Sequence, residues 1–174
     1  DYNEKETVIK WDPAVKKASD RAASWEEVNH NRIDVLDTDH APHTIEAKEN
    51  TYCNAPSGGP LVQHAVMGIL QKVKEGNLSL ERAVEKMSPA VAACFHIDKR
   101  GYIREDYFDD LVVVDPNKSY TVNKSNILYK CGWSPFEGVT FDHSIDITFV
   151  NGHIVYQEGK VIEGNTGARM TFHG

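Results

Sequence analysis

The stretch that decides the fold is Arg32 to His43, RIDVLDTDHAPH, in which a short apolar run ends abruptly in acidic and imidazole side chains. Its apolar residues predict a short buried strand over 33–38, and residues 38–43 form the turn at the C-terminal end of that strand. Carboxylate and imidazole groups gather in this way at the mouth of an α/β barrel. We therefore expect the chemistry of the chain at Asp37, Asp39, His40 and His43.

The segments on either side of this stretch read as helices and loops. Residues 7–11 are expected to be extended, and Ser19 or Asp20 to cap a helix that fades at 29–31. The polar loop over 40–59 is longer than an ordinary connection, and loops of that length usually cover a functional site. Three helices are then predicted: one from Pro60 to Gly76, one capped by Ser79, and a short one that starts at Ser88-Pro89 and runs through Phe95.

The pattern changes after residue 97. Leu111 to Val114 predicts a buried strand between turn residues, and the alternating segments 145–149 and 153–156 are joined by Asn151-Gly152, a strong hairpin signal. The predicted fold class is α/β: the C-terminal part of a (β/α)8 barrel over 1–96, followed by strands of a small β-sandwich over 97–174. Because a closed barrel needs roughly 250 residues, we expect the chain to be the C-terminal piece of a larger one.

Composition narrows the possible partners. The chain has 174 residues, 26 acidic against 19 basic side chains, and a formal charge of −7. This balance argues against a nucleic-acid surface, which needs a basic stripe. Apolar runs are too short for a membrane span and no signal-peptide core is visible, so a cytoplasmic protein that binds no membrane is expected. The three cysteines are widely spaced and predict free thiols rather than a disulfide framework or zinc knuckle.

Two groups of residues are candidates for a site. Asp39 and His43 have the side chains that zinc binds, although they equally fit a role in capping a turn. Ser57 to Gly59 precede Pro60 at an expected helix start, where backbone N–H groups bind anions, or where an ordinary helix entry is found. The histidines scattered singly along the chain are expected to be surface or hydrogen-bonded core residues: His64, His96, His143, His153 and His173.

Four segments resemble the dihydroorotases of the cyclic amidohydrolase superfamily. They are TDHAPH at 38–43, APSGGPLVQHA at 55–65, GYIREDYFDDLVVVD at 101–115 and LYKCGWSPFEG at 128–138. The first and last are the most specific to that family. The resemblance implies a metal-dependent (β/α)8 barrel with a small β-sandwich, and an enzyme that interconverts N-carbamoyl-L-aspartate and the small molecule L-dihydroorotate in pyrimidine synthesis.

The resemblance also implies roles for individual residues. Asp39 matches the last metal ligand and general acid/base, with zinc as the metal and two ions in the complete enzyme. His43 matches a residue that holds the substrate carboxylate, Ser57 and Gly58 match a loop that touches the pyrimidine ring, and His40 is expected to be structural. Asp12 is expected at the substrate as well, where the family commonly has asparagine. The family also implies a homodimer.

The missing residues leave alternatives open. The family's other metal ligands, a His-x-His pair, a carboxylated lysine and two further histidines, match nothing in this sequence. The chain alone is therefore not expected to build the metal site. One alternative is a catalytically silent dihydroorotase-like scaffold or fragment, and another is a related cyclic amidohydrolase, such as a dihydropyrimidinase or allantoinase.

Overall fold

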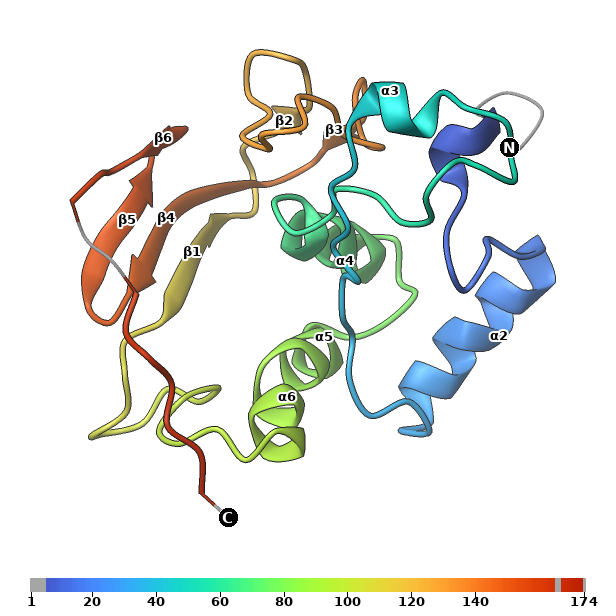
Figure 1. Cartoon of the computed structure of the whole chain (residues 1–174). Coiled ribbons are helices and arrows are strands. Elements are labelled where there is room, and N and C mark those ends of the chain that lie inside the picture. Colours follow the sequence, from blue (N-terminus) through green and yellow to red (C-terminus); the bar gives the residue numbers. More distant parts are fainter. Residues whose placement is uncertain (1–5, 165–166, 174) are drawn as a thin grey trace.

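The computed structural model describes residues 6–164 and 167–173. In Figure 1 the four-stranded sheet forms one side of the molecule, the helices the other, and helix α4 lies between them. Within the described residues, six helical segments precede six strands along the chain. They are η1 (Glu6–Ile9), α2 (Ala18–Asn29), α3 (Ile45–Lys48), α4 (Ala65–Lys74), α5 (Leu80–Met87), α6 (Pro89–Cys94), β1 (Leu111–Asp115), β2 (Tyr120–Thr121), β3 (Thr140–Phe141), β4 (Ser144–Val150), β5 (His153–Gln157) and β6 (Lys160–Val161).

Helix α2 directly precedes the stretch at 32–43. The helix is capped from its third position, because Asp20 Oδ2 accepts the backbone N–H of Lys17 at 3.0 Å. Lys17, rather than the predicted Ser19 or Asp20, is therefore the N-cap residue. The helix ends at Asn29, within the predicted interval, because the turn that follows finds polar partners elsewhere.

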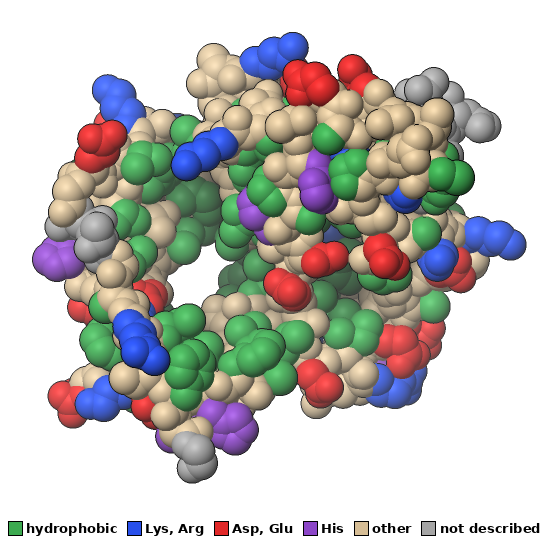
Figure 2. All heavy atoms as spheres, viewed as in Figure 1, with side chains coloured by type: hydrophobic (Ala, Val, Ile, Leu, Met, Phe, Trp, Pro, Cys, Tyr) green, Lys and Arg blue, Asp and Glu red, His purple; other side chains and the backbone are tan. Residues whose placement is uncertain are grey.

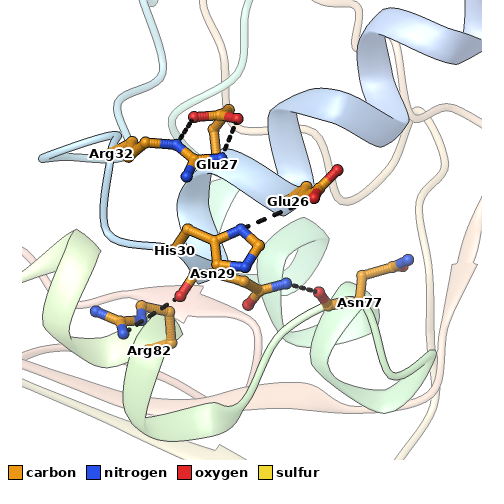
Figure 3. Close-up of polar contacts among 7 residues, drawn as sticks. All are labelled: Glu26, Glu27, Asn29, His30, Arg32, Asn77 and Arg82. Carbon is orange, nitrogen blue, oxygen red and sulfur yellow. Dashed lines mark hydrogen bonds and ion pairs between the residues drawn. The ribbon is translucent and has the colours of Figure 1, made fainter.

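The turn after α2 is fixed to the helices that follow (Figure 3). Asn29 Nδ2 donates to the carbonyl of Asn77 at 2.8 Å, and the Arg82 guanidinium donates to the carbonyl of Asn29 at 3.5 Å. Arg32 forms an ion pair with Glu27, one helical turn back. These bonds set the direction in which residues 32–43 leave the helix.

Residues 33–38 run extended across the helices but do not form the predicted strand. Ile33 and Leu36 are only partly buried, against the core formed by Val28, Leu78 and Ala83. The N–H of Leu36 bonds to a helix carbonyl, at Lys86, at 3.0 Å. A parallel strand needs hydrogen-bonded strands beside it. Among the described residues, the one bridge on this stretch is the parallel pair His40–Gly59.

The helices agree with the sequence except at two of their beginnings and at α3, a short helix inside the loop that was predicted over 40–59. Residues Glu6–Ile9 form a 3₁₀ turn where an extended segment was predicted. Helix α4 begins at Ala65 rather than Pro60, because the N–H of Gln63 bonds to Tyr129 OH and the Gly59 carbonyl, its partner in such a helix, accepts the N–H of Ala41. Ser79 caps α5 as predicted, with its Oγ accepting the N–H of Arg82 at 3.1 Å.

The larger sheet is antiparallel, in the order β1-β4-β5-β6, and β2 pairs with β3. The predicted hairpin is confirmed, with Asn151 (φ 50°) and Gly152 (φ 79°) both in the left-handed region between β4 and β5. This is the backbone geometry of a type I′ turn. The C-terminal segment returns from the sheet to the helices, where Phe172 bridges Ile97.

Strand β1 forms where it was predicted but it is not buried. Val112 and Val113 are 46% and 44% exposed. Figure 2 shows a hollow between the sheet and the helices, with hydrophobic side chains around it. Among the described residues, no other segment therefore covers the exposed valines of this strand.

A second core joins the helical and β-rich parts. Met67 of α4 packs with Val122 and Phe141, and Phe136 closes the cluster. The two parts therefore share buried surface, and the boundary at 96/97 stays a prediction. Among the described residues, no helix has the length and apolar character that a bilayer span requires.

Candidate functional site

The loop at 38–43 begins at Asp39, the central candidate. Asp39 is exposed and has φ 43°, in the left-handed region that residues other than glycine seldom occupy. Among the described residues, no hydrogen bond or ion pair of its carboxylate is found. A strained backbone and an available carboxylate are both features that collect at functional sites. The turn-capping role that the sequence left open is not what Asp39 does.

His40 fixes this loop to the segment that precedes α4. Its Nδ1 accepts the N–H of Leu61 at 3.0 Å and that of Val62 at 3.4 Å. The N–H of Ala41 also bonds to the carbonyl of Gly59 at 3.1 Å. Because Nδ1 is an acceptor, the proton of the neutral imidazole is on Nε2. His40 therefore has a structural role, as predicted.

Two glycines allow this close approach. A Cβ on Gly58, whose φ is +98°, would lie 2.6 Å from Ala41 Cβ. A Cβ on Gly59 would lie 2.7 Å from the ring of Trp11. The loops that carry Asp39, Ser57 and Gly58 therefore lie against each other and against the segment that carries Asp12.

The backbone at Ser57 and Gly58 does not form the anion site considered from the sequence. Helix α4 begins seven residues after Gly58, so its positive end is not at this loop. The N–H of Gly58 is also occupied, since it donates to the carbonyl of Lys10 at 2.9 Å. The prediction of a helix-start anion site is therefore wrong. Substrate contact by the Ser57 side chain stays a prediction.

The segment at 128–138 forms the wall behind the two loops. The indole Nε1–H of Trp133 donates to the carbonyl of His43 at 2.8 Å, and the ring is buried, as a packing residue should be. Tyr129 OH accepts the N–H of Gln63 at 2.8 Å, and its ring lies 5.4 Å from that of His40. Asp39 and His43 are thus on a loop that three separate segments support.

His64 is a buried residue that sequence reasoning mistook for a satisfied one. Its side chain is fully buried, with Nδ1 3.1 Å from Ser134 Oγ, but Nε2 has no hydrogen-bond partner among the described residues. Burial lowers the pKa of His64 to about 4, and burial raises the pKa of the neighbouring Tyr129 to about 12. Neither group carries charge near neutral pH. Among the singly scattered histidines, His64 is the one inside a segment of the family resemblance (55–65), but nothing in that segment indicates its burial.

Lys48 was missed altogether. It is fully buried, and its ammonium donates to three backbone carbonyls of the two neighbouring segments, at Lys10, Pro56 and Gly58. A lysine in a polar loop normally predicts exposure, so the sequence gives no sign of this role.

Asp12 is exposed and lies next to an apolar groove of about 360 Å³. The groove is lined by residues of the 9–15 segment together with Leu61, Pro135 and Phe136. Its walls supply no acid, base or metal ligand.

The described residues do not form a metal site by themselves. No group of three or more His, Cys, Asp or Glu side chains lies close enough together, in the part of the chain that the structure describes, to hold a metal ion. Asp39 can supply one ligand, because neither oxygen of its carboxylate has a partner among the described residues.

The chain has a mixed α/β fold, with helices in its first part and sheets in its second, and this is the fold class that the sequence predicted. Residues 9–155 match the amidohydrolase family, and the chain belongs to that family. Amidohydrolases are generally metal-dependent enzymes.

Curated relatives and a solved structure agree with this assignment. The chain is 33% identical to a dihydroorotase of Pyrococcus abyssi over 174 residues, which is 100% of this chain and 41% of the relative. It is 33% identical to a dihydroorotase of Clostridium acetobutylicum over 153 residues, 87% of this chain and 36% of that protein. The L-hydantoinase (dihydropyrimidinase) of Arthrobacter aurescens superposes with a TM-score of 0.84 at 28% identity, covering 92% of this chain and 37% of its own. The chain thus spans about two fifths of the length of these relatives.

Proposed function

We propose that this chain is part of a dihydroorotase, a cyclic amide hydrolase that interconverts L-dihydroorotate and N-carbamoyl-L-aspartate. The observation that carries the proposal is the 2.8 Å hydrogen bond from Trp133 to the carbonyl of His43. It joins the two segments most specific to the dihydroorotase resemblance, 38–43 and 128–138, into one wall. The dihydroorotases among the relatives, several of them aligned over the whole chain, support the same function.

Asp39 is the proposed metal ligand and general acid/base. A carboxylate that is exposed, unpaired and held on a stiff loop is suited to carry a proton to the ring nitrogen as the amide bond breaks. Zinc is the proposed metal, bound as two ions by Asp39 together with ligands outside this chain. When bound, zinc polarises the amide carbonyl and lowers the pKa of water.

The substrate contacts proposed for this chain come from three segments. His43 holds the substrate carboxylate, Ser57 and Gly58 touch the ring, and Asp12 borders the same space. The support is that the backbones of these segments contact one another, through Gly58 to Lys10 and through Ala41 to Gly59. We further infer a homodimer from the family resemblance, and a cytoplasmic location from the short apolar runs of the sequence.

The experiment that tests the function is a comparison of substrates with the full-length protein. We expect kcat/KM for L-dihydroorotate to exceed that for hydantoin and allantoin by at least about a hundredfold, which is roughly 3 kcal/mol of transition-state discrimination. The likeness to the L-hydantoinase makes a related cyclic amidohydrolase the second candidate. A preference for hydantoin or allantoin would establish that candidate instead.

A further inference from the structure

Lys48, the last residue of α3, is a charged side chain with no exposed surface. Its Nζ donates to the backbone carbonyls of Lys10 at 3.0 Å, Pro56 at 2.9 Å and Gly58 at 2.9 Å. An ammonium group has three N–H donors, so each donor has one acceptor. We call these three acceptors the carbonyl cage.

The cage holds the ammonium without a carboxylate. Among the described ion pairs, none involves Lys48. Its other close neighbours are the Trp11 ring, 5.5 Å from Nζ, and Lys10, whose own ammonium donates to the carbonyls of Tyr52 and Ala55. Burial, and to a smaller extent the positive Lys10, lower the pKa of Lys48. The side chain is therefore held as a monovalent cation would be, by carbonyl dipoles and an aromatic face.

The three carbonyls lie on the two segments that carry the residues proposed to contact substrate. Two of them, at Pro56 and Gly58, lie on either side of Ser57. The third, at Lys10, is two residues before Asp12 and also accepts the N–H of Gly58 at 2.9 Å. Converging carbonyl dipoles repel one another unless a cation or donor lies between them. The backbone bond from Gly58 to Lys10 would remain without the ammonium, but the carbonyls of Pro56 and Gly58 would lose the donor that they share with the carbonyl of Lys10.

We infer that Lys48 is a positioning residue: its ammonium is a built-in cation that fixes the segments 10–12 and 56–58 to each other and thereby sets the affinity for substrate. The effect on substrate rests on the proposed function, in which Asp12, Ser57 and Gly58 contact it. Lys48 itself has no exposed atom with which to touch a ligand.

The first test replaces the cation with a side chain of similar size, Lys48→Met, in the full-length protein. We expect KM for L-dihydroorotate to rise by about tenfold with kcat within about threefold, the pattern of lost binding rather than lost chemistry. Hydrogen exchange at the Gly58 amide should accelerate by a similar factor. The matched control is Lys86→Met, because Lys86 is also buried but its ammonium donates to Asn31 Oδ1, in another part of the fold. That variant should leave KM and Gly58 exchange unchanged.

The second test is chemical rescue. Lys48→Ala leaves the cage without its ammonium, so added propylammonium should restore KM and slow Gly58 exchange in a saturable way, whereas propanol at the same concentration should not. If the alanine variant does not fold alone, propylammonium should restore its folding and propanol should fail. Rescue by both compounds, or by neither, would show that the charge is not what positions the segments.

The two proposals can fail separately. A wild-type protein that does not hydrolyse L-dihydroorotate refutes the proposed function, while the Gly58 exchange and its response to propylammonium still decide whether the cage is a cation site. An active wild type whose Lys48→Met variant matches Lys86→Met in KM and in Gly58 exchange overturns the role of Lys48 and leaves the function standing.

Discussion

The indole N–H of Trp133 donates a 2.8 Å hydrogen bond to the carbonyl of His43, which lies 90 residues earlier in the chain. A buried tryptophan N–H needs such a partner, and this one is on the loop that carries Asp39. The contact therefore couples a segment near the C-terminal sheet to the candidate catalytic loop.

Removing this hydrogen bond should loosen the loop. Trp133→Phe keeps an aromatic ring but removes the donor, so we expect the free energy of unfolding to fall by about 1–2 kcal/mol. KM for L-dihydroorotate should rise, because His43 is no longer fixed. Urea unfolding and steady-state kinetics measure the two effects. Trp25→Phe, on α2, is the control; an equal change of KM in that variant would contradict the link between Trp133 and the site.

Gly58 should not tolerate a side chain. Gly58→Ala places a Cβ 2.6 Å from Ala41 Cβ at φ +98°, so the two loops must separate. Gly76→Ala is the matched control, since its φ is +80° but nothing lies within 4 Å of the added atom. Both variants should lose about 1 kcal/mol from the left-handed backbone, measured by urea unfolding. Gly58→Ala should lose clearly more and should also raise KM. Equal losses would mean that the loops are not in close contact.

Acid should destabilise the fold through His64. Its pKa is about 4 in the folded chain, against an ordinary value of 6.5. The unfolded chain therefore binds the proton more readily between these values, and stability falls as pH drops from about 6.5 towards 4. Urea midpoints across this range should fall less steeply for His64→Gln than for the wild type. The hydroxyl groups of the neighbouring Tyr120 and Tyr129 stay neutral in this pH range, because the ordinary pKa of tyrosine is far higher and burial raises it further in both. An unchanged slope in the variant would rule out His64 as the cause.

Asp12 should weaken the binding of an anionic substrate. An aspartate carboxylate only accepts hydrogen bonds and repels negative charge, whereas asparagine also donates. We expect Asp12→Asn to lower KM for L-dihydroorotate several-fold, since like charges about 4 Å apart repel by roughly 1 kcal/mol in water. Asp106→Asn, at an exposed turn far along the chain, should leave KM unchanged. Equal values of KM for Asp12→Asn and the wild type would remove Asp12 from the substrate site.

Local signals in the sequence predicted local structure well. Asn151-Gly152 specified the hairpin, and Ser79 specified the start of α5, because the geometry of each is decided within a few residues. The segment 33–38 was misjudged because a parallel strand depends on neighbours that are distant in sequence. Pro60 was misjudged for a similar reason: the N–H of Gln63 and the carbonyl of Gly59, which would form the first hydrogen bond of that helix, bond to Tyr129 and Ala41 instead.

The candidate site was predictable only in part. The carboxylate and imidazole residues stood out as a cluster, and the resemblance of four segments gave them roles. Lys48 lies outside those segments, and His64 lies inside one of them without a role of its own, so the burial of both became visible only in the fold. Lys48 is held by backbone carbonyls and His64 by packing, and neither kind of contact can be predicted from a pattern of side chains.

The central claim is that Asp39 carries the proton in dihydroorotate hydrolysis, and the most direct test is Asp39→Asn beside Asp37→Asn in the full-length protein. Both residues are exposed aspartates at the end of the same stretch, but Asp37 only bonds to the N–H of Thr38. Initial rates of L-dihydroorotate hydrolysis should fall by about 10²–10⁴ or more for Asp39→Asn, the range that a general acid/base supplies, and by less than about threefold for Asp37→Asn. Appreciable turnover in the Asp39 variant, or equal losses in both, would contradict the account.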